Sequence, residues 1–88
     1  MKRVRVRVAG RVQGVFFRDS VRGEVAGRDV AGWVRNCADG TVEAVFEGAP
    51  DAVDALVDFC RGGPGHADVE QVEVAEEDPE GLEGFEVR

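Results

Sequence analysis

The sequence predicts an α+β fold in which two helices cover one face of a mainly antiparallel sheet. Several short segments alternate apolar and polar residues with a period of two, which is typical of strands with one buried face. Two other segments repeat their apolar residues every three to four positions, which is typical of amphipathic helices. Asp-Gly, Gly-Pro and Gly-rich segments separate these elements, and the 88 residues are expected to form one domain, 1–88.

The first half of the chain is expected to form a strand, a helix and a second strand. Residues 2–9 alternate valine with arginine, which predicts a buried valine face and a largely hydrated arginine face. A helix is expected from about residue 17 to residue 28, and three apolar side chains should face the sheet: Phe17, Val21 and Val25. The alternation in residues 30–37 predicts the next strand.

The second half is expected to form a hairpin, a helix and two further strands. Asp39-Gly40 predicts a tight turn before a strand at 41–47, and Pro50 suits the first position of a helix that ends near Arg61. A strand is expected at 68–75, where Val69 is out of phase and indicates a β-bulge or a late start. An exposed acidic loop at 76–81 should lead to a short last strand at 84–88. The order β-α-β-β-α-β, plus this strand, predicts a ferredoxin-like sandwich, the split β-α-β fold.

The charge is unevenly distributed along the chain. Residues 1–36 carry nine Lys or Arg and three acidic side chains, whereas residues 37–88 carry fifteen acidic side chains and two arginines. The net charge of −7 opposes general nucleic-acid binding. An acidic chain with one lysine and ten arginines suits a salt-rich cytoplasm, although codon bias in a GC-rich genome gives the same composition.

Other features bear on the location and on cofactors. No apolar segment approaches the roughly 20 residues of a membrane span, and the N-terminal residues lack an apolar signal core, so we expect a cytoplasmic protein without membrane contact. We also expect a monomer. Cys37 and Cys60 have no disulfide or metal-site spacing and are expected to be free thiols. We predict neither a metal site nor a cofactor.

Residues 10–18, Gly-Arg-Val-Gln-Gly-Val-Phe-Phe-Arg, join the first strand to the first helix. Backbone N–H groups are unpaired at a helix start and the helix dipole is positive there, so this loop is suited to a phosphate-type anion. Arg18 adds a planar fork that can pair with two phosphate oxygens. The loop lacks the lysine and hydroxyl of a Walker-type loop and the G-x-G of a dinucleotide loop. From spacing alone, a tight turn with surface arginines is an equal alternative.

Asn36 is a second candidate because it ends a strand beside a turn. Its amide can donate and accept, so it could hold a water molecule and direct it at an electrophile. The alternative is an asparagine that caps the turn.

These segments resemble the acylphosphatase family. The resemblance rests on residues 10–18, on Gly32-Trp33-Val34-Arg35-Asn36 and on Asp39-Gly40-Thr41-Val42-Glu43, and it extends to Gly48, Gly63-Pro64 and residues 84–88. It implies a ferredoxin-like enzyme that hydrolyses the carboxyl-phosphate bond of small acyl phosphates to a carboxylate and inorganic phosphate. Members of the family often have a Leu-Gly-Leu type segment where the chain leaves the first helix, whereas this sequence has Arg28-Asp29-Val30. We expect this difference to affect stability more than catalysis.

The resemblance also implies roles for individual residues. The arginine that matches Arg18 binds the phosphoryl group, and the asparagine that matches Asn36 positions the attacking water. Phosphate binding by the loop is expected to involve Arg11, Val12, Gln13, Gly14, Val15, Phe16 and Phe17 together with Arg18.

Two alternatives stay open at this point. One is a non-catalytic phosphate- or carbamoyl-phosphate-binding module of the same fold. The other is an RNA-binding sandwich, which the charge and the absence of an aromatic stacking platform oppose. Among the other residues, Arg35 could assist anion attraction and Glu76-Glu77 are expected on a solvated edge; packing or surface positions without catalysis are expected for Trp33, His66 and Cys37.

Overall fold

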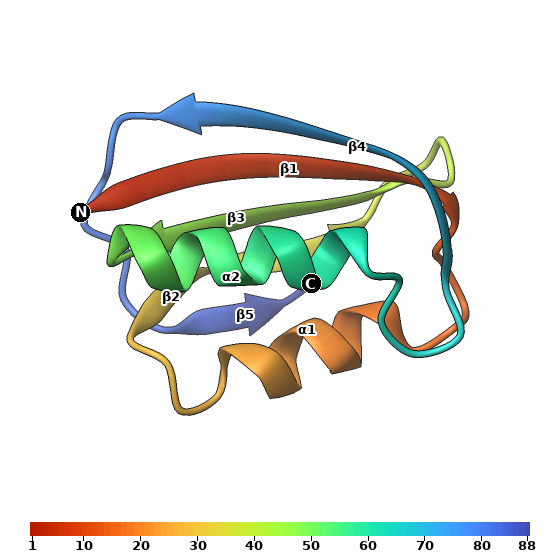
Figure 1. Ribbon diagram of the computed structural model, residues 1–88, viewed down its shortest axis with the longest axis horizontal. Helices are drawn as coiled ribbons and strands as arrows, with labels where there is room; N and C mark the ends of the chain where they lie inside the picture. Colours follow the sequence, from red (N-terminus) through yellow and green to blue (C-terminus); the bar gives the residue numbers. More distant parts are fainter.

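The computed structural model describes all 88 residues as one sheet with two helices. The elements follow the chain as β1 (Lys2–Arg11), α1 (Phe17–Val25), β2 (Val30–Asn36), β3 (Val42–Gly48), α2 (Pro50–Arg61), β4 (Asp68–Glu77) and β5 (Phe85–Val87). The strand order is β4-β1-β3-β2-β5, and only β5 runs parallel to its neighbour, β2. Both helices cover the same face (Figure 1), which confirms the predicted ferredoxin-like α+β fold.

The core lies between the helices and the sheet. Helix α1 packs on β2 and β5, and α2 packs on β1, β3 and β4. The valines that alternate along β1 are buried as predicted, and Phe17, Phe46 and Leu56 are the largest fully buried apolar side chains. Neither helix is long and apolar enough to cross a membrane.

Helix α1 is shorter than predicted and ends at Val25 rather than near residue 28. Ala26 is extended, and Gly27 has a φ of +83°, which a glycine adopts without steric cost. The guanidinium of Arg28 donates to the carbonyl of Glu24, so it satisfies one of the acceptors that the helix end leaves free.

Strands β1 and β4 are each two residues longer than predicted. The predicted bulge is confirmed, because Ala9 pairs with Gln71 and Gly10 pairs with Val69, which leaves Glu70 as the additional residue. Pairing then continues past this point, and a Cβ on Gly10 would collide with the carbonyl of Asp68. At the other end Glu77 pairs with Arg3, so the predicted loop at 76–81 begins later.

The face of the sheet opposite the helices is less hydrated than predicted. Arg3, Glu43 and Glu47 are only 4%, 5% and 2% exposed. Strand β1 lies between β3 and β4, so its arginines stand beside the glutamates of both neighbours. The basic and acidic halves of the chain therefore interleave, in ion pairs that include Arg3–Glu77 at 3.0 Å, Arg5–Glu77 at 2.7 Å and Arg35–Glu43 at 2.7 Å.

These pairs correct two expectations about single side chains. Glu76 is exposed on the edge strand β4, as predicted, whereas the partly exposed carboxylate of Glu77 accepts hydrogen bonds from Arg5 and Arg3, which hold its pKa below the ordinary value. Arg35 is bound to Glu43 and also lies over the ring of Trp33, 5.7 Å from its centre. Trp33 packs as predicted, although beneath guanidinium groups rather than in the core.

Candidate active site

The loop between β1 and α1 has two left-handed residues. Gly14 has a φ of +71°, and Phe16, which immediately precedes the helix, has a φ of +61° and a ψ of 23°. The first helical hydrogen bond runs from the N–H of Ser20 to the carbonyl of Phe16, at 2.9 Å. None of the backbone N–H groups of residues 14–19 donates to a backbone carbonyl, and no side chain caps the helix. The loop therefore presents free donors at the positive end of the helix dipole.

The loop is held in place by the core and by the connection between α2 and β4. Val12 and Val15 are buried in the core, and the N–H of His66 approaches the carbonyl of Val15 at 3.5 Å. The guanidinium of Arg11 donates to the carbonyl of His66 at 3.0 Å and pairs with Asp68 at 3.5 Å. The side chain of Arg11 thus braces the α2–β4 connection.

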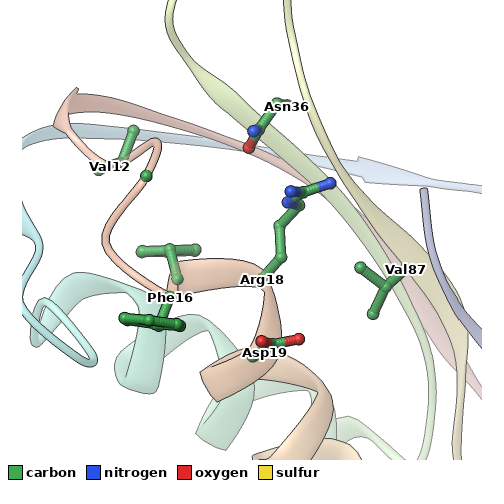
Figure 2. A pocket seen from close by; sticks show the side chains of 8 residues that line it. Val12, Phe16, Arg18, Asp19, Asn36 and Val87 are labelled. Carbon is green, nitrogen blue, oxygen red and sulfur yellow. The ribbon is translucent and has the colours of Figure 1, made fainter.

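A pocket of about 310 Å³ opens in front of the loop. Figure 2 shows the Arg18 side chain rising from α1 toward Asn36, which comes from the end of β2. The lining consists of Val12, Gly14, Phe16, Phe17, Arg18, Asp19, Asn36 and Val87. Segments that are far apart in the sequence thus meet in one concave site.

Arg18 differs from the other cations of the basic half. Each other Lys or Arg among residues 1–36 has a carboxylate oxygen within 4.0 Å. Arg18 has no Asp or Glu oxygen within that distance, and its guanidinium donates instead to the main-chain oxygen of Arg88, the last residue of the sequence, at 2.7 Å. No acidic side chain therefore neutralises its positive charge, and its remaining N–H groups can bind an anion in the pocket.

Asn36 carries an unsatisfied buried atom. Its side-chain oxygen is buried and has no hydrogen-bond partner in the protein. Leaving such an acceptor unpaired is costly, and residues of this kind are often found where a ligand or a water molecule completes the site.

Gln13 connects the two sides of the site. Its amide nitrogen donates to the carbonyls of Cys37 and Thr41, at 2.8 and 2.9 Å. Both carbonyls belong to the β2–β3 turn that follows Asn36. Within that turn the Asp39 carboxylate accepts hydrogen bonds from the N–H and the hydroxyl of Thr41, and these bonds lower its pKa. Sequence reasoning placed Gln13 in the phosphate cradle and did not foresee this link, because it depends on a contact between distant segments.

The structure brings together most, but not all, of the side chains predicted for the site. Arg18 and Asn36 line the pocket with four loop residues, whereas the side chains of Arg11, Gln13 and Val15 do not line it. Asp19 and Val87 line it and were not predicted. Asp19 could have been found from its position after Arg18, but Val87 depends on the pairing of β5 with β2.

Neither cysteine lines the pocket. Burial raises the pKa of the Cys60 thiol to about 12, so this group is an inert part of the core. Cys37 is a partly buried free thiol, as predicted. No group of three or more His, Cys, Asp or Glu side chains is placed to share a cation.

A ferredoxin-like fold that places free N–H groups and an arginine without an acidic partner at one pocket has the geometry that a phosphate-type anion requires. A family model described as Acylphosphatase matches residues 4–87. An acylphosphatase of Rubrobacter xylanophilus is 64% identical over 88 residues, which cover 99% of this chain and 80% of the relative. The acylphosphatase of Natronomonas pharaonis is 52% identical over 86 residues, which cover 98% and 94%. The chain belongs to the acylphosphatase family.

The solved structures agree with this assignment. The crystal structure of acylphosphatase from Bacillus subtilis matches with a TM-score of 0.94 at 38% identity, over 100% of this chain and 99% of that one. The chain is thus a hydrolase of the carboxyl-phosphate bond of acyl phosphates. This confirms the predicted activity. The fold also matches part of a larger protein, HypF of T. kodakarensis, with a TM-score of 0.82 at 30% identity over 100% of this chain and 12% of that one.

Proposed function

We propose that the loop amides and Arg18 bind the phosphoryl group of the acyl phosphate, while Asn36 orients the attacking water. One observation carries this assignment: the only cation of the basic half without an Asp or Glu partner lies in the same pocket as the free N–H groups of residues 14–19. Oriented donors of this kind stabilise the charge that spreads over the equatorial oxygens during phosphoryl transfer.

The reaction needs little help from acids or bases. A water oxygen attacks phosphorus, the bond between phosphorus and the bridging oxygen breaks, and its electron pair leaves with the carboxylate. A carboxylate is a good leaving group, so it needs no proton from the protein. We propose that the proton of the water passes to the phosphate product, because the neutral amide of Asn36 is a poor base.

The unpaired oxygen of Asn36 supports its proposed role. A water molecule that donates to this oxygen would be held at the end of β2, across the pocket from α1. When the water is already held in one orientation, less entropy is lost on reaching the transition state, so the barrier is lower.

The test is hydrolysis of benzoyl phosphate in the presence of a chelator. Arg18→Ala should lower kcat/KM by about 10²- to 10³-fold, which is the usual effect of removing one donor that stabilises transition-state charge in an enzyme. Asn36→Ala should lower kcat by roughly a hundredfold with less effect on inhibition by phosphate. Arg61→Ala is the matched control, since Arg61 is exposed at the end of α2 and has no ion-pair partner. Near wild-type activity in a folded Arg18 or Asn36 variant would refute the assignment.

We further propose that residues 1–88 act as a single monomeric domain in a salt-rich cytoplasm. The support is the net charge of −7 and the relatives in genera such as Haloarcula. Sedimentation should give one species of about 9.5 kDa. The thermal midpoint should rise between about 0.1 and 2 M salt, because screening removes repulsion among the acidic side chains; a flat or falling midpoint contradicts the salt adaptation.

A further inference from the structure

Phe16 is exposed in a conformation that a phenylalanine rarely adopts. The residue is 70% exposed, and its backbone lies in the left-handed region that favours glycine. Phe59 and Phe85 pack against the core, but Phe16 does not. The ring therefore contributes little to folding, and stability alone would favour glycine or asparagine at this position. Unfavourable backbone conformations of this kind are concentrated at functional sites.

The ring of Phe16 belongs to an apolar wall of the pocket. The other apolar side chains of the lining are Val12, Phe17 and Val87. Figure 2 shows Phe16 and Val12 on one side of Arg18 and Val87 on the other. A phosphoryl group bound at Arg18 would thus be flanked by hydrocarbon, which is where the rest of the substrate must lie.

Asp19 places a negative charge in the same pocket. It is the only acidic residue of the lining, and its nearest cation is Arg22, at 3.5 Å along the exposed side of α1. A substrate with a second carboxylate or phosphate near its acyl end would be repelled by this side chain.

We propose that the preferred substrate is an acyl phosphate whose acyl group is apolar and uncharged, with Phe16 as the specificity residue and Asp19 as the group that disfavours anionic acyl chains. The inference rests on the proposed binding of the phosphoryl group at Arg18. It goes further because it assigns the acyl half of the pocket.

The test compares kcat/KM for benzoyl, acetyl and succinyl phosphate. Ratios between substrates are compared across variants, so the intrinsic reactivity of each acyl phosphate cancels. In Phe16→Asn the benzoyl-to-acetyl ratio should fall about five- to tenfold, because one aromatic contact is lost while the left-handed backbone is tolerated. Phe16→Gly should give the same result and serves as the second variant if Phe16→Asn unfolds.

Asp19→Asn tests the electrostatic part of the proposal. The succinyl-to-acetyl ratio should rise about three- to tenfold at low ionic strength and less at about 1 M salt, where charges are screened within roughly 3 Å. Glu24→Gln is the matched control, because it removes a carboxylate from the same helix that is paired with Arg28 and lies outside the pocket. Both ratios should stay at the wild-type value in this control.

The outcomes separate the two proposals. Hydrolysis of all three substrates with unchanged ratios in folded Phe16 and Asp19 variants would overturn the substrate class and leave the proposed mechanism intact. A change in Glu24→Gln equal to that in Asp19→Asn would refute the role of Asp19. A folded wild-type protein that hydrolyses none of the substrates would refute the proposed function and, with it, this inference.

Discussion

Glu47 should be among the most important polar side chains for stability, and its replacement by glutamine provides a quantitative test. The residue is 2% exposed on β3, and its two oxygens accept from the N–H groups of Glu80 and Leu82, each at 2.7 Å. The buried guanidinium of Arg3 lies 3.5 Å from one of them. The carboxylate therefore ties the segment before β5 to the centre of the sheet.

The expected loss follows from these contacts. Glutamine keeps one acceptor oxygen but turns an N–H group toward the other donor, so one charge-assisted hydrogen bond disappears and the second weakens. Hydrogen bonds to charged groups contribute about 1.5–3 kcal/mol each, so the free energy of unfolding should fall by roughly 3 kcal/mol. For a domain of this size the thermal midpoint should fall by roughly 12–24 °C.

Urea denaturation followed by circular dichroism measures this loss. Glu73→Gln is the matched control, because Glu73 is exposed on β4 and its carboxylate accepts one hydrogen bond, from Gln71 at 3.5 Å. The control should change stability by less than about 0.5 kcal/mol. If Glu47→Gln and Glu73→Gln cost the same, burial and the two short hydrogen bonds do not have the energetic weight assigned to them.

Three further predictions concern the site, the sheet and acid stability. Gln13→Ala should lower kcat about tenfold, with a smaller loss of affinity for phosphate as an inhibitor, since the turn after Asn36 loses its link to the loop. Equal losses of kcat and of phosphate affinity would contradict this. Gly32→Ala should destabilise by at least about 3 kcal/mol, because a Cβ would collide with the carbonyl of Val45, whereas Gly23→Ala on open helix surface should stabilise by up to about 1 kcal/mol. Hydrogen bonds lower the folded-state pKa of Glu47 and Glu77 below 4.5, so their stabilisation is present above about pH 4.5 and is lost as the pH falls further; acid titrations of wild type and Glu47→Gln should therefore converge at low pH.

The elements of the fold could be predicted because each is encoded locally. Apolar periodicity determines the strands and helices, and Pro50 together with the glycines of residues 62–65 limits α2. The end of α1 was missed because Gly27 acts through a left-handed turn that periodicity does not report.

The buried ion pairs could not be predicted in the same way. Arginine and glutamate alternate with apolar residues in separate segments, so each segment alone predicts an ordinary hydrated face. Only the register of β1 against β3 and β4 shows that Arg3 and Glu47 desolvate one another. The same register neutralises Arg3 and Arg5, whereas Arg18 lies on α1, outside the sheet.

The predicted site depended on the resemblance as well as on local chemistry. The loop at 10–18 and Asn36 were identifiable as anion-binding and water-orienting groups, but spacing alone did not bring them together. Asp19, Val87 and the bridging role of Gln13 emerge only from tertiary contacts.

The parallel pairing of β5 with β2 has a consequence for folding kinetics. Gly32 pairs with Phe85 and Val34 with Val87, although each pair is separated by about fifty residues of chain, and closing such long loops slows folding. The pocket is lined by Val87 as well as by the first loop, so its wall is complete only after this late pairing. In a refolding experiment the helical signal should therefore recover before turnover does, and the lag between them measures the docking of β5.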